Sequence, residues 1–250
     1  MVQEIANSLK GVNCPFLIKN PVNPELSLWL GAIERIAGAG IKNIGAIHRG
    51  FSSFQKTKYR NAPMWQIPLE LKSHFPDIPL YCDPSHIAGN RTMLYDIAQK
   101  ALNLNYDGLM IESHIDPNNA LSDAEQQLTP VALSKLLERL KVRASSSNDV
   151  VYKNHLDELR DKVDNLDREI IEALAARMKA VLEIGEYKKD NNVSIFQLER
   201  WKEITESRQE WSKMLSLNPD LVMDIYKLIH QESITKQTNI FNSDNVKTPS

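Results

Sequence analysis

Short apolar runs alternate with amphipathic segments along the first part of the chain. Each run is apolar at consecutive positions, which is typical of strands buried on both faces of a parallel sheet. The segments between them carry apolar residues every three or four positions, as helices do when one face covers a sheet. We predict strands at Pro15–Lys19, Asn43–His48, Leu80–Asp83 and Gly108–Glu112, and helices at Glu25–Ala39, Asn90–Asn103 and Pro130–Val142. A long connection that contains Pro63, Pro68 and Pro76 separates the second strand from the third.

The four strand–helix units indicate an α/β fold, but they are half the number that closes an eight-stranded TIM barrel. An open half leaves strand edges and an apolar interior uncovered. The pattern also predicts a helix, VQEIANSLK, directly after Met1. We interpret residues 1–144 as the C-terminal half of a barrel, whose other half is absent from this sequence or supplied by another chain. A small open α/β sandwich is the alternative that the pattern leaves open.

The pattern changes after a short polar linker, ASSSND, at Ala144–Asp149. From Val151 to Lys189 there is no proline, and apolar residues recur at helical spacing, which predicts one helix roughly 60 Å long. Two further helices are predicted at about Phe196–Leu215 and Asp220–Gln237. The predicted organisation is a barrel half at 1–144, a linker at 145–150, an all-α domain of three helices at 151–240 and a flexible tail at 241–250. So long a helix cannot cover its own apolar stripe, which favours a dimer.

Composition narrows the function. Hydrophobic residues make up 42% and charged residues 25% of the chain, as in a globular protein, and the net charge of −2 argues against a general nucleic-acid binder. Only Cys14 and Cys82 occur, so no disulfide framework is expected, and both are predicted to be small buried residues. No apolar run has membrane-spanning length and no signal-peptide pattern is present, so we expect no membrane partner and a cytoplasmic location.

Three potential metal ligands, His86, Glu112 and Asp123, end or follow consecutive predicted strands. The carboxyl ends of parallel strands meet at one rim of a barrel, so we expect these side chains to converge there. An imidazole and two carboxylates suit a divalent ion such as manganese, iron, cobalt or zinc. Taken singly, each could merely cap a turn or a helix; together they favour a metal site. His114, two residues beyond Glu112, is a candidate for orienting a ligand rather than for binding the ion.

Five sequence segments of the first part of the chain together resemble one enzyme family. They are KNPVNP (Lys19–Pro24), HRGF (His48–Phe51), DPSH (Asp83–His86), GLMIESH (Gly108–His114) and ALSDAEQQ (Ala120–Gln127). In this order they resemble the C-terminal half of 3-deoxy-D-arabino-heptulosonate 7-phosphate (DAHP) synthase, in the single-barrel form that is often fused to chorismate mutase.

The resemblance implies condensation of phosphoenolpyruvate with erythrose 4-phosphate, with a divalent metal ion, manganese or similar, polarising the aldehyde. Lys19 is expected to supply a proton or a positive field, and Arg49 to grip the phosphate or carboxylate of phosphoenolpyruvate. The alternative is that both are solvated loop charges. The family also takes a cysteine ligand and a Lys-Pro-Arg segment from earlier strands. Neither segment occurs in this sequence, so the synthase is expected to be incomplete in this chain.

A second polar set lies in the helical part: Arg160, Arg177, Lys188, Arg200, Ser233 and Gln237. Arg177 and Lys188 are about three turns apart and share a helix face. Arg160 lies 17 residues before Arg177, about 25 Å away along a straight helix, so one chain cannot bring both to one small ligand. If both serve one ligand, Arg160 comes from a second protomer, which predicts an intertwined homodimer. The alternative is that these are surface cations in i,i+4 ion pairs.

The run LRDKVDNLDREIIEALAARMKAVLEIGEYKK, then ER at Glu199-Arg200 and QESITKQ at Gln231–Gln237, resembles the all-helical (AroQ-type) chorismate mutase family. The resemblance implies rearrangement of chorismate to prephenate without a cofactor. Two arginines, Arg160 and Arg177, are expected to clamp the carboxylates. Lys188 and Gln237 are expected to donate to the ether oxygen, where negative charge develops.

Arg200 and Ser233 are expected to complete the contacts to carboxylate and hydroxyl. Relatives carry an acidic pair around Arg200 where this chain has Gln197 and Trp201, from which we expect a changed affinity and a retained reaction. The leading prediction is a bifunctional shikimate-pathway enzyme. A non-catalytic module that senses prephenate or chorismate on a structural half-barrel is the alternative, and a different metal-dependent aldolase is a third.

Overall fold

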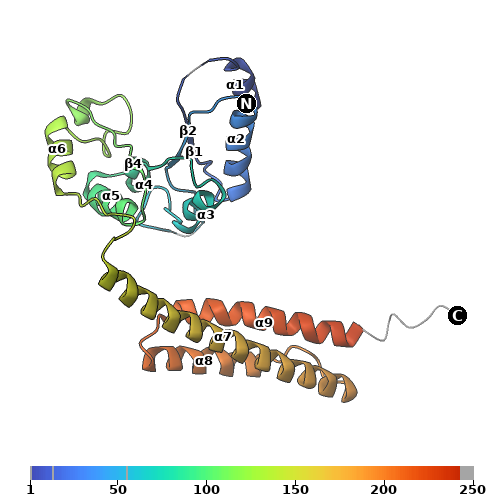
Figure 1. The fold of residues 1–250 in the computed structure, drawn as a ribbon. Helices are drawn as coiled ribbons and strands as arrows, with labels where there is room; N and C mark the ends of the chain where they lie inside the picture. Colours follow the sequence, from blue (N-terminus) through green and yellow to red (C-terminus); the bar gives the residue numbers. More distant parts are fainter. Residues whose placement is uncertain (1, 13, 55, 243–250) are drawn as a thin grey trace. The chain divides into compact units, whose positions relative to one another are not determined.

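Four parallel strands lie side by side in the first part of the chain, in the order of the sequence (Figure 1). The computed structural model describes residues 2–12, 14–54 and 56–242, and within them the strands are β1 (Phe16–Lys19), β2 (Ile44–His48), β3 (Leu80–Cys82) and β4 (Gly108–Leu109). Each strand pairs with the next one, Phe16 opposite Ile44, Ala46 opposite Leu80 and Tyr81 opposite Gly108. The predicted α/β fold of four parallel strand–helix units, part of a barrel, is confirmed.

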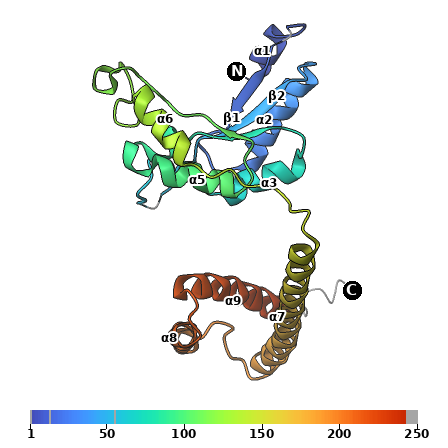
Figure 2. The same cartoon turned by 60° about the vertical axis from the view of Figure 1, so that its left-hand side comes forward.

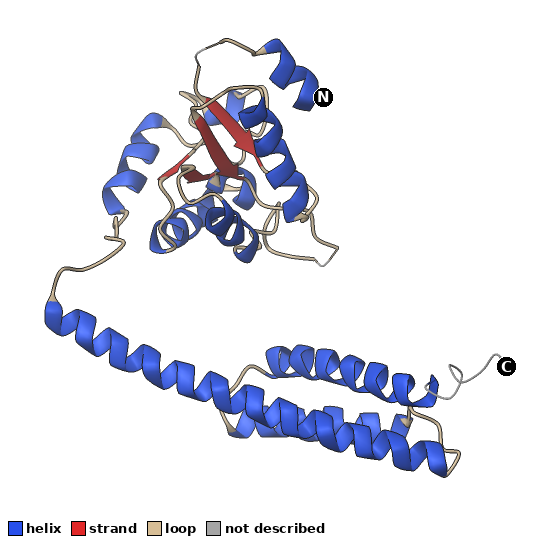
Figure 3. Ribbon diagram, turned by 45° about the vertical axis from the view of Figure 1, so that its right-hand side comes forward, coloured by secondary structure: helices blue, strands red, loops and turns tan. Residues whose placement is uncertain are grey.

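Helices connect these strands and surround them (Figure 3). They are α1 (Val2–Ser8), α2 (Leu26–Gly38), α3 (Gln66–His74), α4 (Pro84–Ala88), α5 (Leu94–Asn103) and α6 (Pro130–Arg139), with 3-10 turns at Arg91–Met93 and Pro117–Asn119. The predicted long connection before the third strand therefore contains a helix, α3. Pro68 made this segment look like a loop, but it lies in the first turn of α3. The backbone N–H groups of a first turn have no intrahelical partner, so proline costs no hydrogen bond there.

The fourth strand is shorter than the predicted Gly108–Glu112. Its pairing with β3 ends at Leu109, and the chain beyond turns toward a later loop: Leu128 donates its N–H to the carbonyl of Glu112, and His114 donates to the carbonyl of Leu128. This departure from the sheet moves Glu112 toward α4, where the Ser85 hydroxyl accepts its backbone N–H at 3.0 Å.

The core of the first unit is formed by the sheet and the helices that follow its strands. Its fully buried members include Trp29, Ile33, Ile36, Leu71, Leu80, Ile87 and Leu94. The imidazole of His48 lies among Phe51, Trp65 and Tyr106, and burial lowers its pKa to about 4, so it is neutral. Cys82 is buried as predicted, whereas Cys14 is only half-buried because it precedes the first strand and lies outside the core.

The chain divides into two units, Met1–Ser147 and Asn148–Ser250. The second consists of three helices in the described residues, α7 (Val150–Asp190), α8 (Leu198–Met214) and α9 (Pro219–Asn242) (Figure 2). The carboxylate of Asp149 caps α7 by accepting the N–H groups of Val151 and Tyr152 at 2.8 and 3.3 Å. The predicted long helix and the two that follow it are confirmed.

Helix α9 extends beyond the predicted end at Gln237 to Asn242, and so includes residues 241 and 242 of the predicted flexible tail. The ammonium of Lys189 donates to the carbonyl of Ile240 at 2.9 Å, so α7 stabilises the last turn of α9 despite its polar sequence. The rest of the predicted tail, 243–250, lies outside the described residues.

The first half of α7 leaves its apolar stripe exposed. Leu159, Val163, Leu166 and Ile170 are 44%, 55%, 56% and 58% exposed, and their spacing places them on one helix face. The buried residues of α7 are Val181 and Gly185, in the half that packs against α9. Within the part of the chain that the structure describes, no helix combines the length and the apolar character needed to cross a membrane.

Candidate functional site

The first candidate site is formed where β3 ends. Asp83 is followed by Pro84 at the start of α4, and its carboxylate caps that short helix by accepting the backbone N–H of His86 at 3.1 Å. Proline at the first helical position fixes the backbone for this turn without losing a hydrogen bond. The Asp-Pro-Ser-His sequence thus places the imidazole of His86 directly beside the carboxylate that caps its own helix.

Asp83 contacts two of the predicted site residues through one oxygen. Its Oδ2 lies 2.8 Å from Nδ1 of His86 and 3.1 Å from the ammonium of Lys19 on β1. Burial alone would raise the pKa of Asp83, which is 1% exposed, but the contacts to His86 and the charge of Lys19 outweigh burial and lower that pKa. An ionised carboxylate therefore orients His86, with Nδ1 toward Asp83 and Nε2 directed away.

The structure brings the three predicted metal ligands together. Nε2 of His86 lies 3.6 Å from Oε1 of Glu112, and His86, Glu112 and Asp123 each offer a ligand atom within 4.8 Å of the others. All three are partly exposed, so an ion can reach them. The donor set, one imidazole nitrogen oriented by a carboxylate and two carboxylate oxygens, fits a divalent ion of the hard or borderline class. His114 lies outside this group, since its Nδ1 accepts the N–H of Asp116 at 3.0 Å in a local turn.

Two residues that the sequence did not single out hold the acidic ligands in place. Arg60 donates to Oδ1 of Asp123 at 2.7 Å and to Oε1 of Gln126 at 2.9 Å. Gln126, which is 1% exposed, donates in turn to Glu112 at 2.8 Å. Asp123 has a φ of 51°, a left-handed conformation that aspartate tolerates better than most residues. The only sequence signal for Arg60 was a cation in a loop, which by itself indicates nothing.

Arg49 follows β2 at the same end of the sheet as Lys19. Its backbone N–H donates to the side chain of Asn20 at 2.6 Å, and Asn20 also donates to the carbonyl of Gly50 at 2.8 Å. Asn20 is 3% exposed, so it ties the ends of β1 and β2 together from inside. The Nε of Arg49 is buried and has no hydrogen-bond partner in the described residues.

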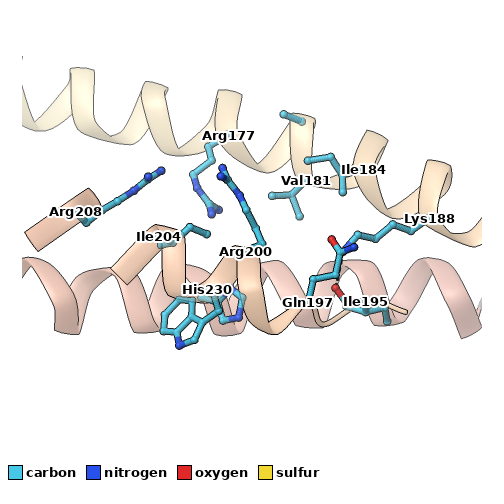
Figure 4. Close-up of a pocket in the computed structure, with 12 residues that line it drawn as sticks. Arg177, Val181, Ile184, Lys188, Ile195, Gln197, Arg200, Ile204, Arg208 and His230 are labelled. Atoms are coloured by element: carbon cyan, nitrogen blue, oxygen red, sulfur yellow. Dashed lines mark hydrogen bonds between the residues drawn. The ribbon is translucent and has the colours of Figure 1, made fainter. Parts of the chain in front are cut away.

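The second candidate site is a pocket in the helical unit (Figure 4). Three of the six residues predicted for this site line it: Arg177 and Lys188 from α7 and Arg200 from α8. The remaining lining residues are Ala180, Val181, Ile184, Ile195, Gln197, Trp201, Ile204, Arg208 and His230. No acidic side chain lines the pocket among the described residues.

Ser233 and Gln237 lie on α9 beside this pocket and are buried. Arg177 donates to the hydroxyl of Ser233 at 2.8 Å, which fixes its guanidinium. Gln237 packs its Cγ against α7 at Gly185, where a Cβ would come within 3.0 Å, and its Oε1 is buried with no hydrogen-bond partner in the described residues. A larger residue than glycine at position 185 would therefore crowd Gln237 and, at 2.8 Å, the Cδ1 of Ile240.

Arg160 does not reach this pocket. It is 66% exposed and pairs with Asp157 on its own helix at 3.3 Å. Because α7 is a single helix from Val150 to Asp190, Arg160 and Arg177 are about 25 Å apart along its axis.

Burial and neighbouring cations lower the pKa values of basic side chains that line the pocket. Burial lowers the pKa of Arg177, and the neighbouring Arg208 and Arg200 lower it further. Burial also lowers the pKa of Lys188, whose ammonium donates to the carbonyl of Ile195 at 2.6 Å. The pKa of His230 is lowered by burial and by Arg177 and Lys188. The pocket therefore favours anionic ligands.

Trp201 occupies a position where the resemblance to chorismate mutase predicts an acidic residue. Its ring stacks on His230 of α9, with centroids 4.1 Å apart and planes 25° apart. Phe196 meets the same imidazole edge-on at 6.2 Å. Aromatic rings from the start of α8, from α9 and from the segment before α8 thus lie together, and Arg200 forms its ion pair with the exposed Glu203 at 2.8 Å.

Comparisons with known proteins divide the chain in the same way. The sequence profile of the DAHP synthetase I family matches residues 2–146, and that of chorismate mutase type II matches residues 159–238. The phospho-2-dehydro-3-deoxyheptonate aldolase of Thermotoga maritima is 29% identical over 135 residues, 54% of this chain and 39% of that protein. The bifunctional chorismate mutase/prephenate dehydratase of Buchnera aphidicola subsp. Schizaphis graminum is 36% identical over 90 residues, 36% of this chain and 23% of that protein.

A solved structure described as a truncated form of 3-deoxy-D-arabino-heptulosonate 7-phosphate synthase from Thermotoga maritima matches the first unit. It has a TM-score of 0.50 and 26% identity, and the match covers 54% of this chain and 51% of that one. The chain spans less than half of the length of the two curated relatives named above.

Proposed function

The chain belongs to the DAHP synthetase I family and carries a type II chorismate mutase domain, and on this basis we propose that it is a bifunctional enzyme of aromatic amino-acid biosynthesis. Its helical unit converts chorismate to prephenate, and its barrel unit takes part in the condensation of phosphoenolpyruvate with erythrose 4-phosphate. The observation that carries the proposal is the meeting of Arg177, Lys188 and Arg200 in one pocket. Such a set suits a small dianion such as chorismate.

The mutase reaction needs no covalent step, so the side chains act by position and charge. Arg177, fixed by Ser233, holds one carboxylate of chorismate and brings the reacting atoms together. Lys188 and Gln237 donate to the ether oxygen as the C–O bond breaks and negative charge develops there. The unpartnered Oε1 of Gln237 leaves its amide free to turn its NH₂ group toward this oxygen. Arg200 completes the contact to the second carboxylate or the hydroxyl.

Arg160 reaches this site from a second copy of the chain. The exposed apolar stripe of α7 supports a homodimer, since Leu159, Val163, Leu166 and Ile170 lie on one helix face and are each 44% exposed or more. Two such helices that pack together bury both stripes. They also bring Arg160 of each chain toward the pocket of the other.

In the barrel unit His86, Glu112 and Asp123 hold a divalent ion, manganese or similar, with His86 oriented by Asp83. The bound ion supplies Lewis acidity toward a carbonyl oxygen. Lys19 lies beside the same carboxylate and provides a positive charge, or a proton, for phosphoenolpyruvate. Arg49, with a buried Nε that has no partner in the described residues, binds its phosphate or carboxylate.

Loss of chorismate absorbance in the ultraviolet tests the proposal. The intact chain is expected to consume chorismate and form prephenate, and Arg177→Ala is expected to remove this activity. Lys179→Ala, an exposed lysine two residues along the same helix, serves as the matched control and should behave as the wild type. Tight binding of chorismate without turnover would instead support a sensor domain, and no binding at all would refute both functions.

A further inference from the structure

A fourth cation of the helical pocket, Arg208, lies outside the set that the chorismate mutase resemblance predicts. It is on α8, eight residues beyond Arg200, and lines the same pocket. Figure 4 shows the guanidinium groups of Arg177, Arg200 and Arg208 directed toward one another in the space between α7 and α8. Arg208 therefore extends the cationic wall of the pocket beyond Arg177.

Aromatic rings hold this side chain in place. The guanidinium carbon of Arg208 lies 4.5 Å from the ring centroid of Trp211, one turn further along α8, and 5.3 Å from that of Tyr226 on α9. Stacking on two rings fixes a planar guanidinium without using its N–H groups. The long side chain thus loses its freedom before a ligand arrives, which reduces the entropy that binding has to overcome.

Most donors of Arg208 remain unused. Its Nη1 donates to the hydroxyl of Ser207 at 2.9 Å, and its Nε is buried with no hydrogen-bond partner in the described residues. A guanidinium has five N–H donors in a planar fork that matches a carboxylate. The described residues place no acidic side chain in this pocket to accept them. Positioned but unsatisfied donors are what a carboxylate of a ligand requires.

We propose that Arg208 is a further substrate-binding residue of the mutase pocket, and that its guanidinium contacts a carboxylate of the bound dicarboxylate. The inference rests on the proposed mutase function. It also gives one chain a third guanidinium, beside Arg177 and Arg200, at the end of the pocket away from Lys188, in addition to the Arg160 proposed to come from a second protomer. Such a contact serves substrate and transition state alike, because the carboxylates keep their charge throughout the rearrangement.

Four variants of the full-length chain test this role: Arg208→Gln, Arg208→Lys, Trp211→Leu and the control Lys213→Gln, an exposed lysine on the same helix. Turnover of chorismate gives KM and kcat, and calorimetry with prephenate gives a dissociation constant that does not depend on turnover. Loss of one charge-assisted hydrogen bond predicts that Arg208→Gln raises both KM and the dissociation constant by about tenfold or more, with kcat changed less. Arg208→Lys and Trp211→Leu should give smaller increases, and Lys213→Gln none.

The outcomes separate this role from a structural one and from the proposed function itself. If Arg208→Gln lowers the melting temperature or kcat while KM and the prephenate dissociation constant keep their wild-type values, Arg208 only joins α8 to α9 and the inference is wrong. Unchanged values of all these quantities also overturn it. A wild-type chain that neither binds prephenate nor converts chorismate refutes the mutase function, and the inference with it.

Discussion

The candidate sites of the two units differ in how their charged side chains are balanced. In the barrel unit charged side chains of the candidate site pair with side chains of opposite sign, Lys19 with Asp83 and Arg60 with Asp123. In the helical unit, Arg177, Lys188 and Arg208 share a pocket that no acidic side chain lines among the described residues. The first arrangement suits a cation held among balanced charges, and the second suits a dianion that brings the missing charge with it.

The units also differ in how they bury apolar surface. The first has a core of fully buried residues around Trp29 and Leu80, whereas the first half of α7 exposes its apolar stripe. Buried apolar area is the main source of folding stability. The barrel unit therefore obtains its core within one chain, whereas the helical unit leaves apolar surface of α7 for the proposed homodimer to bury.

Introducing charge into the apolar stripe of α7 should have the largest effect. We expect the double variant Leu166→Asp, Ile170→Asp to be monomeric in light scattering and to lose mutase turnover by about a thousandfold or more, because Arg160 no longer reaches a ligand held by the other chain. Metal binding by the barrel unit should be unaffected. Asp161→Lys, on the opposite face of the helix, is the control for altered charge. A monomer that retains turnover would contradict the dimeric site.

Removal of the imidazole should have the next largest effect, and only on the barrel unit. His86→Ala is expected to weaken Mn²⁺ binding, measured by calorimetry, by about a hundredfold or more, since one ligand of three is lost. His114→Ala is the matched control, because that imidazole lies in a local turn outside the cluster. Equal losses in the two variants would show that His86 is no ligand.

Asp83→Asn should have a smaller effect on the same measurement. The carboxylate orients His86 without belonging to the metal cluster, and loss of such a contact typically costs about 10- to 100-fold in metal affinity. Asp116→Asn, an exposed acid nearby, should leave the affinity unchanged. An affinity in Asp83→Asn equal to that of the wild type would mean that His86 is oriented by other contacts.

The smallest expected effect is a displacement of a pH profile. Burial lowers the pKa of Lys188 below the ordinary lysine value of about 10.4. The charged ammonium is the active form, so kcat/KM for chorismate is retained below this pKa and falls as the pH rises through it. The fall in kcat should lie at higher pH, because a bound dianion stabilises the ammonium. If both profiles stay flat up to the ordinary lysine pKa, Lys188 plays no part as a cation.

Periodicity was sufficient to predict much of this structure. Consecutive apolar positions identified the parallel strands, and helical spacing from Val151 to Lys189 identified α7 within one residue at each end. The elements that were missed depended on a local exception to a sequence rule or on contacts distant in sequence. Helix α3 was hidden by Pro68, and the last turn of α9 by a polar sequence that Lys189 stabilises from another helix.

The same limit applies to the sites. Residues carried by a motif, such as His86 in Asp-Pro-Ser-His, could be named from the sequence because their roles depend on local geometry and strand position. Three other residues could not be named in this way, because their importance comes from partners distant in sequence. Arg60 contacts Asp123, 63 positions away, and Gln126 contacts Glu112, 14 positions away. Arg208 stacks on Tyr226 of α9, 18 positions away. A lone arginine or glutamine in a sequence gives no indication of such a partner.

The single oxygen of Asp83 that touches both Lys19 and His86 has one more consequence. An anion that draws the ammonium of Lys19 toward itself leaves the whole negative charge of the carboxylate to the imidazole, which then donates more strongly to a cation. The proposed binding of phosphoenolpyruvate and of a metal ion would thereby be thermodynamically linked, and each would strengthen the other by the same factor. Positive cooperativity between two ligands of opposite sign follows from one shared counter-ion.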